Sequence, residues 1–104
     1  WLEDSLSVVE DFPAYGQSPI AVTEFGVMRW VPGAARYVEN LFDIFEGRGW
    51  NHALWMWYPT SFPASDDDFD FMRGSDPTNH TEVTTSALIE TIKNNWALNT
   101  VHPL

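Results

Sequence analysis

The stretch that best predicts the fold is residues 19–26, which read PIAVTEFG. Residues 20–23 are apolar or β-branched, as is typical of a short buried strand. We expect this strand to end at Glu24, because an aromatic residue, a glycine and then a loop over residues 27–33 follow it. The pattern therefore places a carboxylate at the carboxyl end of a buried strand.

A helix and a second apolar run follow this stretch. From Ala34 to about Glu46, apolar side chains recur at the spacing of a core-facing helix. Gly47 is expected to end that helix. Residues 52–58, HALWMWY, are apolar on both alternating faces, which predicts a parallel strand covered on both sides.

The rest of the chain predicts two more helices and a long loop. Residues 2–12 carry apolar side chains at helical spacing, and residues 88–96 mark a last helix before a tail at 99–104. Residues 60–82 are a long polar stretch. A loop of that length in a compact domain is usually functional or disordered.

This order of elements predicts the α/β class. Two strands that start about thirty residues apart, with a helix between them, have the length of a right-handed βαβ unit. Two parallel strands cannot bury both faces of a sheet, so we expect the remainder of a larger fold, or another copy of the chain, to flank them. The chain has 104 residues, far fewer than the roughly 250 of an eight-fold βα barrel.

Composition disfavours several function classes. Fifteen acidic and five basic side chains give a net charge of −10, so neither nucleic acid nor an anionic membrane is an expected partner. No apolar run approaches the ~20 residues that span a bilayer. The absence of cysteine excludes a disulfide framework and a thiolate metal site. Six Trp, seven Phe and three Tyr are many for this length, and such rings either fill a core or stack against pyranose rings.

Glu24 is the first candidate functional residue. Barrels of the α/β type place their catalytic groups at the carboxyl ends of strands, where a rigid strand aims a side chain into the barrel mouth. From position alone, a solvated strand-end residue or a helix-capping acid is the more common occurrence. The surrounding residues decide between these interpretations.

Residues 19–26, a helix, and then GWNHALWMW at residues 49–57 together resemble the end of glycoside hydrolase family 5, the cellulase family. In that family the seventh strand ends in a Glu followed by an aromatic residue and Gly, and the eighth strand ends in a Trp. The resemblance spans essentially the whole chain, residues 1–104, from the sixth helix to the eighth. It implies the C-terminal fragment of a TIM (β/α)8 barrel, with its last two parallel strands and their flanking helices.

The resemblance also implies roles for single residues. Glu24 matches the nucleophile of a retaining glycosidase, in which a second carboxyl group about 5–5.5 Å away acts as acid and base. The family's acid/base Glu follows an Asn at the end of the fourth strand, and no such pair follows a strand here. The other candidates lie on or near predicted helices: Glu39, Glu46, Glu82 and Glu90. The chain alone is therefore expected to be inactive, or very nearly so.

Aromatic residues complete the implied substrate site. Trp55 is the best match to the family's eighth-strand tryptophan, Trp57 is the second choice, and packing in the barrel core is the alternative for both. Arg29 and Trp30 lie on the loop after the nucleophile and are candidates for sugar contacts in outer subsites or, equally, for loop packing. His52 starts its strand at the opposite end of the barrel and is expected to be structural.

Other constellations are weaker. Asp66, Asp67, Asp68 and Asp70 invite a calcium interpretation, but the run lacks the glycine and closing glutamate of a helix-loop-helix site, and acidic runs in loops are usually solvated. Asn79-His80-Thr81 is a formal N-glycosylation acceptor. His80 and His102 lack partners at metal-ligand spacing. No metal and no cofactor are expected.

The sequence thus predicts part of a retaining glycoside hydrolase that cleaves a β-linked glucan or, as a second choice, a mannan. Its expected partners are the carbohydrate substrate and either the rest of the barrel or another copy of the chain. Family resemblance implies a secreted protein. Three alternatives remain open: a non-catalytic barrel fragment that self-associates, a carbohydrate-binding module that uses Trp30, Trp55 and Trp57, and another retaining family of the same barrel clan, which would keep Glu24 but change the substrate.

Overall fold

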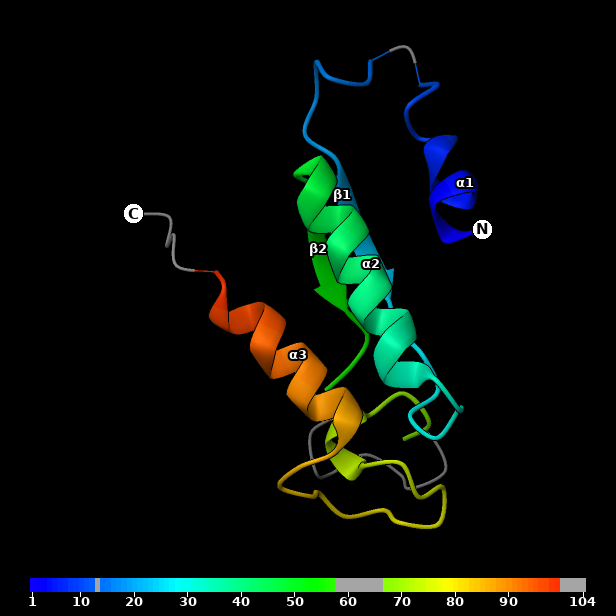
Figure 1. The fold of residues 1–104 in the computed structure, drawn as a ribbon, viewed down its shortest axis with the longest axis vertical. Helices are drawn as coiled ribbons and strands as arrows, with labels where there is room; N and C mark the ends of the chain where they lie inside the picture. The colour runs from blue at the N-terminus through cyan, green and yellow to red at the C-terminus, as the bar shows by residue number, and fades with distance from the viewer. Residues whose placement is uncertain (13, 58–66, 100–104) are drawn as a thin grey trace.

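The computed structural model describes residues 1–12, 14–57 and 67–99 (Figure 1). The two strands of this part pair in parallel and form one two-stranded sheet. The architecture is therefore mixed α/β, as the order of elements predicted. In chain order the elements are α1 (Leu2–Ser7), β1 (Ala21–Phe25), α2 (Ala34–Arg48), β2 (Asn51–Leu54), the 3-10 helix η2 (Phe71–Arg73) and α3 (Ala87–Ala97).

The ends of several elements differ from the prediction. α2 runs through Gly47 and ends at Arg48, and the residue that caps it is Gly49, whose φ of 66° is the left-handed conformation that glycine adopts without steric cost. α1 ends at Ser7, and turns follow it instead of the predicted helix to residue 12. β2 ends at Leu54, while the end of the predicted strand at Tyr58 lies outside the described residues.

The register between the strands is irregular near the candidate site. Val22 lies opposite His52 and Phe25 lies opposite Leu54, so three steps along β1 match two steps along β2. This bulge lets Val22 and Phe25 face the same way, although side chains an odd number of residues apart normally point to opposite faces. Both side chains pack against the core under α2.

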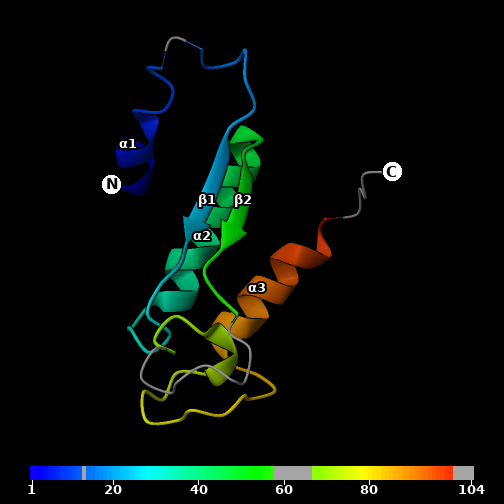
Figure 2. The same ribbon diagram turned by 180° about the vertical axis from the view of Figure 1, so that it is seen from behind.

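Only one face of the sheet is covered. α2 lies across that face in both opposite views (Figures 1 and 2), and Phe25 packs edge-on against Phe45 with 5.1 Å between ring centres. The prediction that the second strand is covered on both sides is wrong for the described chain, because no second layer buries its other face. That face leaves five side chains exposed: Ala21, Thr23, Glu24, Asn51 and Ala53.

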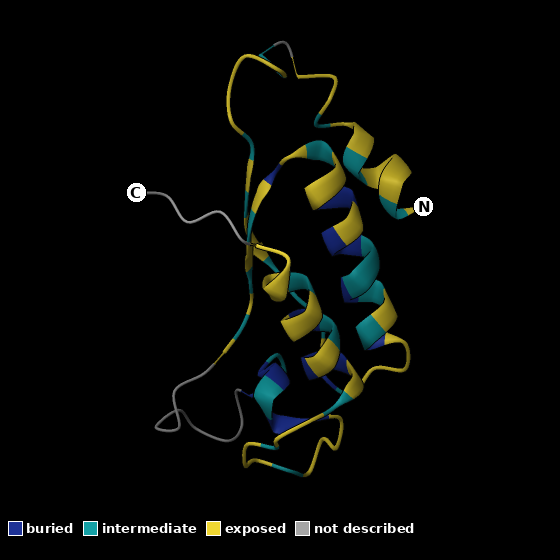
Figure 3. Cartoon of the chain, turned by 60° about the vertical axis from the view of Figure 1, so that its left-hand side comes forward, coloured by how far each residue is buried: buried dark blue, intermediate teal, exposed yellow. Residues whose placement is uncertain are grey.

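The core lies between α2 and its neighbours (Figure 3). Val38 and Phe42 of α2 meet Ile89 and Ile92 of α3, and all four side chains are fully buried. Burying one such side chain contributes roughly 1.5–3 kcal/mol. A second cluster joins the other end of α2 to Trp50 and to the partly buried apolar side of α1. The helices thus anchor the two strands by one face and leave the other free.

Candidate functional site

The carboxyl ends of β1 and β2 lie side by side at one end of the sheet (Figure 2). The Trp55 amide donates a hydrogen bond to the Phe25 carbonyl over 2.6 Å, and the Trp55–Met56 peptide bond is cis. Gly26 packs directly on the Trp55 carbonyl, so a Cβ at residue 26 would collide with that oxygen. The close approach of two backbones therefore requires this glycine, and it brings the Glu24 segment next to Trp55.

Glu24 lies within β1, one residue before the strand ends, and the residue is exposed, whereas Val22 and Phe25 pack against the core under α2. A residue inside a strand caps no helix, so the helix-capping alternative is wrong. The carboxylate is therefore accessible to solvent or to a ligand, next to the backbone that carries Trp55.

Trp55 and Trp57 follow β2 and are both open to solvent. Their exposed fractions are 43% and 65%, which are high for indole side chains. Rings that expose so much apolar surface do not contribute mainly to the core of the described chain. They offer the flat faces that sugar rings stack against.

Arg29 has a different environment from the two tryptophans. Only 2% of the residue is exposed, and its carbon Cζ lies 5.2 Å from the centre of the Trp30 ring. The guanidinium donates to the Asp67 carboxylate over 3.2 Å. It also donates to five backbone carbonyls, those of Asp67, Arg73, Gly74, Asp76 and Asn79.

These acceptors satisfy all five N–H groups of Arg29, so none is left for a sugar hydroxyl. Of the two interpretations of this residue, the contacts support packing within the loops rather than contact with substrate. Trp30, whose ring lies beside the guanidinium, is half-buried and belongs to the same packed loop.

A cluster of buried charges surrounds Arg29. Asp67 and Asp70 are 1% and 0% exposed, so the prediction of a solvated acidic run is wrong for these two residues. Asp70 accepts a hydrogen bond from Arg73 Nε over 3.0 Å, and His80 Nδ1 lies 2.9 Å from Asp67 Oδ2. Two arginines and two aspartates balance each other in charge, which is the condition under which buried ions are tolerated.

Asp67 is held in its charged form by its neighbours. Burial alone would raise the pKa of Asp67, but hydrogen bonds from His80 and Arg29 and the positive charge of Arg29 outweigh it, so this pKa lies below its ordinary value. His80, which the sequence left without a partner, is therefore one of the groups that stabilise a buried carboxylate. Both carboxylate oxygens of Asp67 thus have partners within the protein, and Asp66 lies outside the described residues.

Sequence analysis missed this cluster. One signal was available: Asp70 and Arg73 are three residues apart, which is the spacing of an ion pair on one helical turn, and Asp70 also accepts a hydrogen bond from the Met72 amide at the start of η2. Nothing in the sequence indicates that Arg29, some forty residues away, pairs with Asp67. In the part of the chain that the structure describes, no three potential metal ligands gather.

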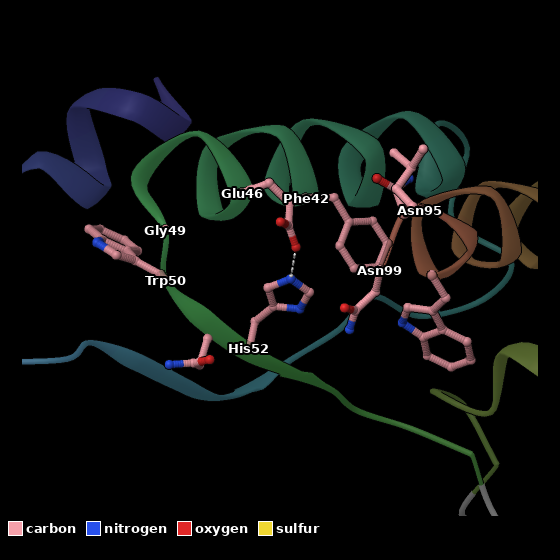
Figure 4. A pocket seen from close by; sticks show the side chains of 10 residues that line it. Phe42, Glu46, Gly49, Trp50, His52, Asn95 and Asn99 are labelled. Atoms are coloured by element: carbon pink, nitrogen blue, oxygen red, sulfur yellow. Dashed lines mark hydrogen bonds and ion pairs between the residues drawn. The ribbon is translucent and has the colours of Figure 1, made fainter. Parts of the chain in front are cut away.

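A hollow of about 570 Å³ lies at the opposite, amino end of β2, between α2 and the end of α3 (Figure 4). His52 Nε2 lies 2.8 Å from Glu46 Oε1 there, and the imidazole ring packs among Phe25, Phe42 and Phe45. These contacts support the structural role expected of His52. The hollow is therefore separate from the strand ends that carry Glu24 and Trp55.

Asn79, the acceptor of the formal glycosylation triplet, is engaged within its own loop. Its side-chain amide donates to the carbonyls of Arg73 and Thr81, each over 2.8 Å. Its side-chain oxygen accepts from the Thr81 amide and hydroxyl. The triplet thus acts as a turn that supports the carbonyl which Asn79 offers to Arg29.

Comparison with family models and with curated protein sequences gives no match for this chain. None of the helices within residues 1–12, 14–57 and 67–99 has both the length and the apolar character that crossing a bilayer requires.

Proposed function

We propose that this chain is the C-terminal part of a retaining glycoside hydrolase of the family 5 type, with Glu24 as its nucleophile and a β-linked glucan or mannan as its substrate. The observation that carries this proposal is the position of Glu24. Its carboxylate is exposed on the open face of β1, and the end of that strand is hydrogen-bonded to the backbone of the exposed Trp55.

The arrangement of layers supports a barrel origin. In a (β/α)8 barrel the connecting helices cover the outside of the sheet, while the strands face each other on the inside. Here α2, which connects the two parallel strands, covers one face, and the other face is open. An open inner face is what the last two strands of such a barrel would show on their own.

Glu24 would supply the nucleophile, and the acid/base carboxyl group would come from outside the described residues. A Glu24 oxygen would attack the anomeric carbon and form a covalent glycosyl ester as the bond to the leaving oxygen breaks. A second carboxyl group would protonate the departing oxygen and then activate the water that cleaves the ester. Trp55 and Trp57 would stack against sugar rings at the site.

A mechanism-based label tests the role of Glu24 without the acid/base. A 2,4-dinitrophenyl 2-deoxy-2-fluoro-β-glycoside has a leaving group that needs no protonation, and its fluorine slows breakdown of the ester. We expect the gluco or manno reagent to label one site, identified as Glu24 by mass spectrometry of peptides. Glu24→Gln should abolish the label, whereas Glu39→Gln, an exposed glutamate on α2, should leave it unchanged. Labelling elsewhere, or none with either reagent, would contradict the proposal.

A non-catalytic carbohydrate-binding module is the second candidate, favoured by the high exposure of Trp55 and Trp57. Isothermal titration with cello- and manno-oligosaccharides separates the two functions. Binding that survives Glu24→Gln, is lost in Trp55→Ala, and is accompanied by no labelling of Glu24 would favour the module. Trp1→Ala, at an exposed tryptophan of the N-terminus, is the matched control.

Self-association is the third candidate, favoured by the face and edges of the two-stranded sheet that residues 1–12, 14–57 and 67–99 leave uncovered. Exposed strand edges are sites at which chains associate. Analytical ultracentrifugation measures this directly. A stable oligomer that neither binds sugar nor becomes labelled would favour a barrel fragment that covers its sheet with another copy.

A further inference from the structure

We propose that the buried Arg29–Asp67 pair is the positioning element of the candidate site: it holds the loop after β1 to the loop after β2 and so sets Glu24 against Trp55. The inference rests on the proposed function for its catalytic consequence. Its structural part, the effect of the pair on Trp55, can be tested independently.

Backbone hydrogen bonds join residues 67–70 to both strands' continuations. Residues 67–70 lie between the two segments that leave the sheet. The Asp68 carbonyl accepts a hydrogen bond from the Arg29 amide over 2.9 Å, and the Phe69 carbonyl accepts one from the Met56 amide over 3.2 Å. One short segment is therefore bonded both to the continuation of β1 and to the residue that follows Trp55.

The Arg29 guanidinium forms hydrogen bonds along the loop after β2. Its bonds to five carbonyls spread over residues 67–79, with distances from 2.6 Å at Asp76 to 3.3 Å at Arg73. Residues 67–79 are thus bonded to one side chain, Arg29, which comes from the loop after β1. Because all five N–H groups are used and the group is buried, few other arrangements of the loop would satisfy it.

The Asp67 carboxylate contacts three basic side chains. One oxygen of Asp67 accepts from Arg29, while the other lies 2.9 Å from His80 Nδ1 and 3.6 Å from Arg73 Nε. Asp67 is thus the residue where Arg29, η2 and the His80 loop meet. If its charge is lost, Arg29 keeps its carbonyl partners but no longer has a counter-ion, so the loop can shift while the helices and the sheet remain.

The consequence for the site is geometric. Gly26 touches the Trp55 carbonyl, and the Trp55 amide is bonded to the Phe25 carbonyl. The Met56 amide is bonded to the Phe69 carbonyl, so a shift of residues 67–70 would pull on the segment that carries Trp55 and move it relative to Glu24. Misplacement of reacting groups by about 1 Å can cost on the order of 10²-fold in rate without a comparable loss of binding. Asp67 and Arg29 would thus act through Trp55 and Glu24 and not by touching the sugar.

The test uses Asp67→Asn, which keeps the size of the side chain, and His80→Asn as a milder change at the exposed end of the same contact. Asp68→Asn is the matched control, because Asp68 is adjacent but its half-buried side chain lies outside the cluster. Two readouts are measured in each variant. They are the rate of Glu24 labelling by the fluoroglycoside and the ¹⁹F NMR resonance of Trp55 in chain labelled with 5-fluorotryptophan, assigned with Trp55→Phe.

We expect Asp67→Asn to lower the maximal labelling rate constant by about 10- to 100-fold, with a change of less than about threefold in the reagent concentration that gives half of this rate. The Trp55 resonance should shift or broaden, His80→Asn should have a smaller effect in the same direction, and Asp68→Asn should match the parent. If Asp67→Asn fails to fold, His80→Asn carries the test. An unchanged Trp55 resonance in the folded Asp67 and His80 variants overturns the positioning role, whether or not the parent is labelled. Absence of labelling in the parent overturns the proposed function alone.

Discussion

The open face of the sheet and the loops at its carboxyl end differ in how completely their polar groups are satisfied. In and just after the strands, Glu24 and Trp55 are both exposed. In the loops, Arg29 and Asp67 are buried, and every N–H of the guanidinium has an acceptor in the protein. The difference is that polar groups in and beside the strands remain accessible, whereas those of the loops are paired within the protein.

The largest effect is expected from Asp67→Ala. Removing one partner of a buried ion pair leaves Arg29 uncompensated, which costs about 3–5 kcal/mol. A loss of this size is a large share of the stability of a small domain. Urea unfolding followed by circular dichroism measures it. Asp68→Ala should cost less than about 1 kcal/mol, and equal losses in the two variants would show that the buried ion pair contributes no more to stability than a half-buried carboxylate of the same loop.

A smaller loss is expected from Gly26→Ala at the join between the two regions. The added Cβ meets the Trp55 carbonyl, and overpacking of this kind typically costs about 1–3 kcal/mol. Gly47→Ala is the matched control, since a Cβ there meets nothing within 4 Å and the residue lies inside α2. That control should stabilise the chain by about 0.5–1 kcal/mol. A neutral Gly26→Ala would mean that the strand ends are less closely packed than the structure shows.

The pH dependence of stability tests whether the charge of Asp67 stabilises the loops. Because the pKa of Asp67 is lowered on folding, its contribution is fully present above its unfolded pKa of about 3.9 and is lost as pH falls through the lower folded value. Urea midpoints from about pH 6 down to about pH 3 should therefore fall more steeply for the parent than for Asp67→Asn. Parallel curves would show that other carboxylates account for the loss at acidic pH.

The smallest effect on stability is expected from Glu24→Gln. An exposed strand residue of this kind changes the free energy of unfolding by less than about 0.5 kcal/mol, even though the same substitution should abolish covalent labelling. Thermal unfolding measures the first quantity and mass spectrometry the second. A marked stabilisation or destabilisation would indicate that the open face of the sheet contributes to folding through Glu24.

Regular elements were predictable because their signals are local. The apolar spacing in residues 34–46 and the β-branched run before Glu24 gave a helix and a parallel strand pair in the right order. Their ends were less predictable. Gly47 and Gly49 are equally good stop signals in sequence, and only the backbone shows that Gly49 adopts the left-handed conformation. The exposure of the second strand was missed, because an apolar run does not reveal which layer covers it.

The candidate site was predictable in part for the same reason. Glu24 lies near the end of β1 and Trp55 directly follows β2, so the order of elements was enough to place their backbones at the same end of the sheet. Arg29 and Asp67 are far apart in sequence and carry no motif. An acidic run in a polar loop has the same sequence appearance whether it is solvated or buried, and only the position of a distant guanidinium decides between the two.

Amino-acid order alone was sufficient for the α/β class, the parallel pairing and the place of Glu24 near a strand end, since these follow from hydrophobic periodicity and from turn residues close in the chain. Tertiary structure alone decided which face of the sheet stays open and which charges are buried. Burial of an ion depends on oppositely charged partners that the fold brings together, such as Arg29 and Asp67, and the residues next to each in sequence do not indicate that partner.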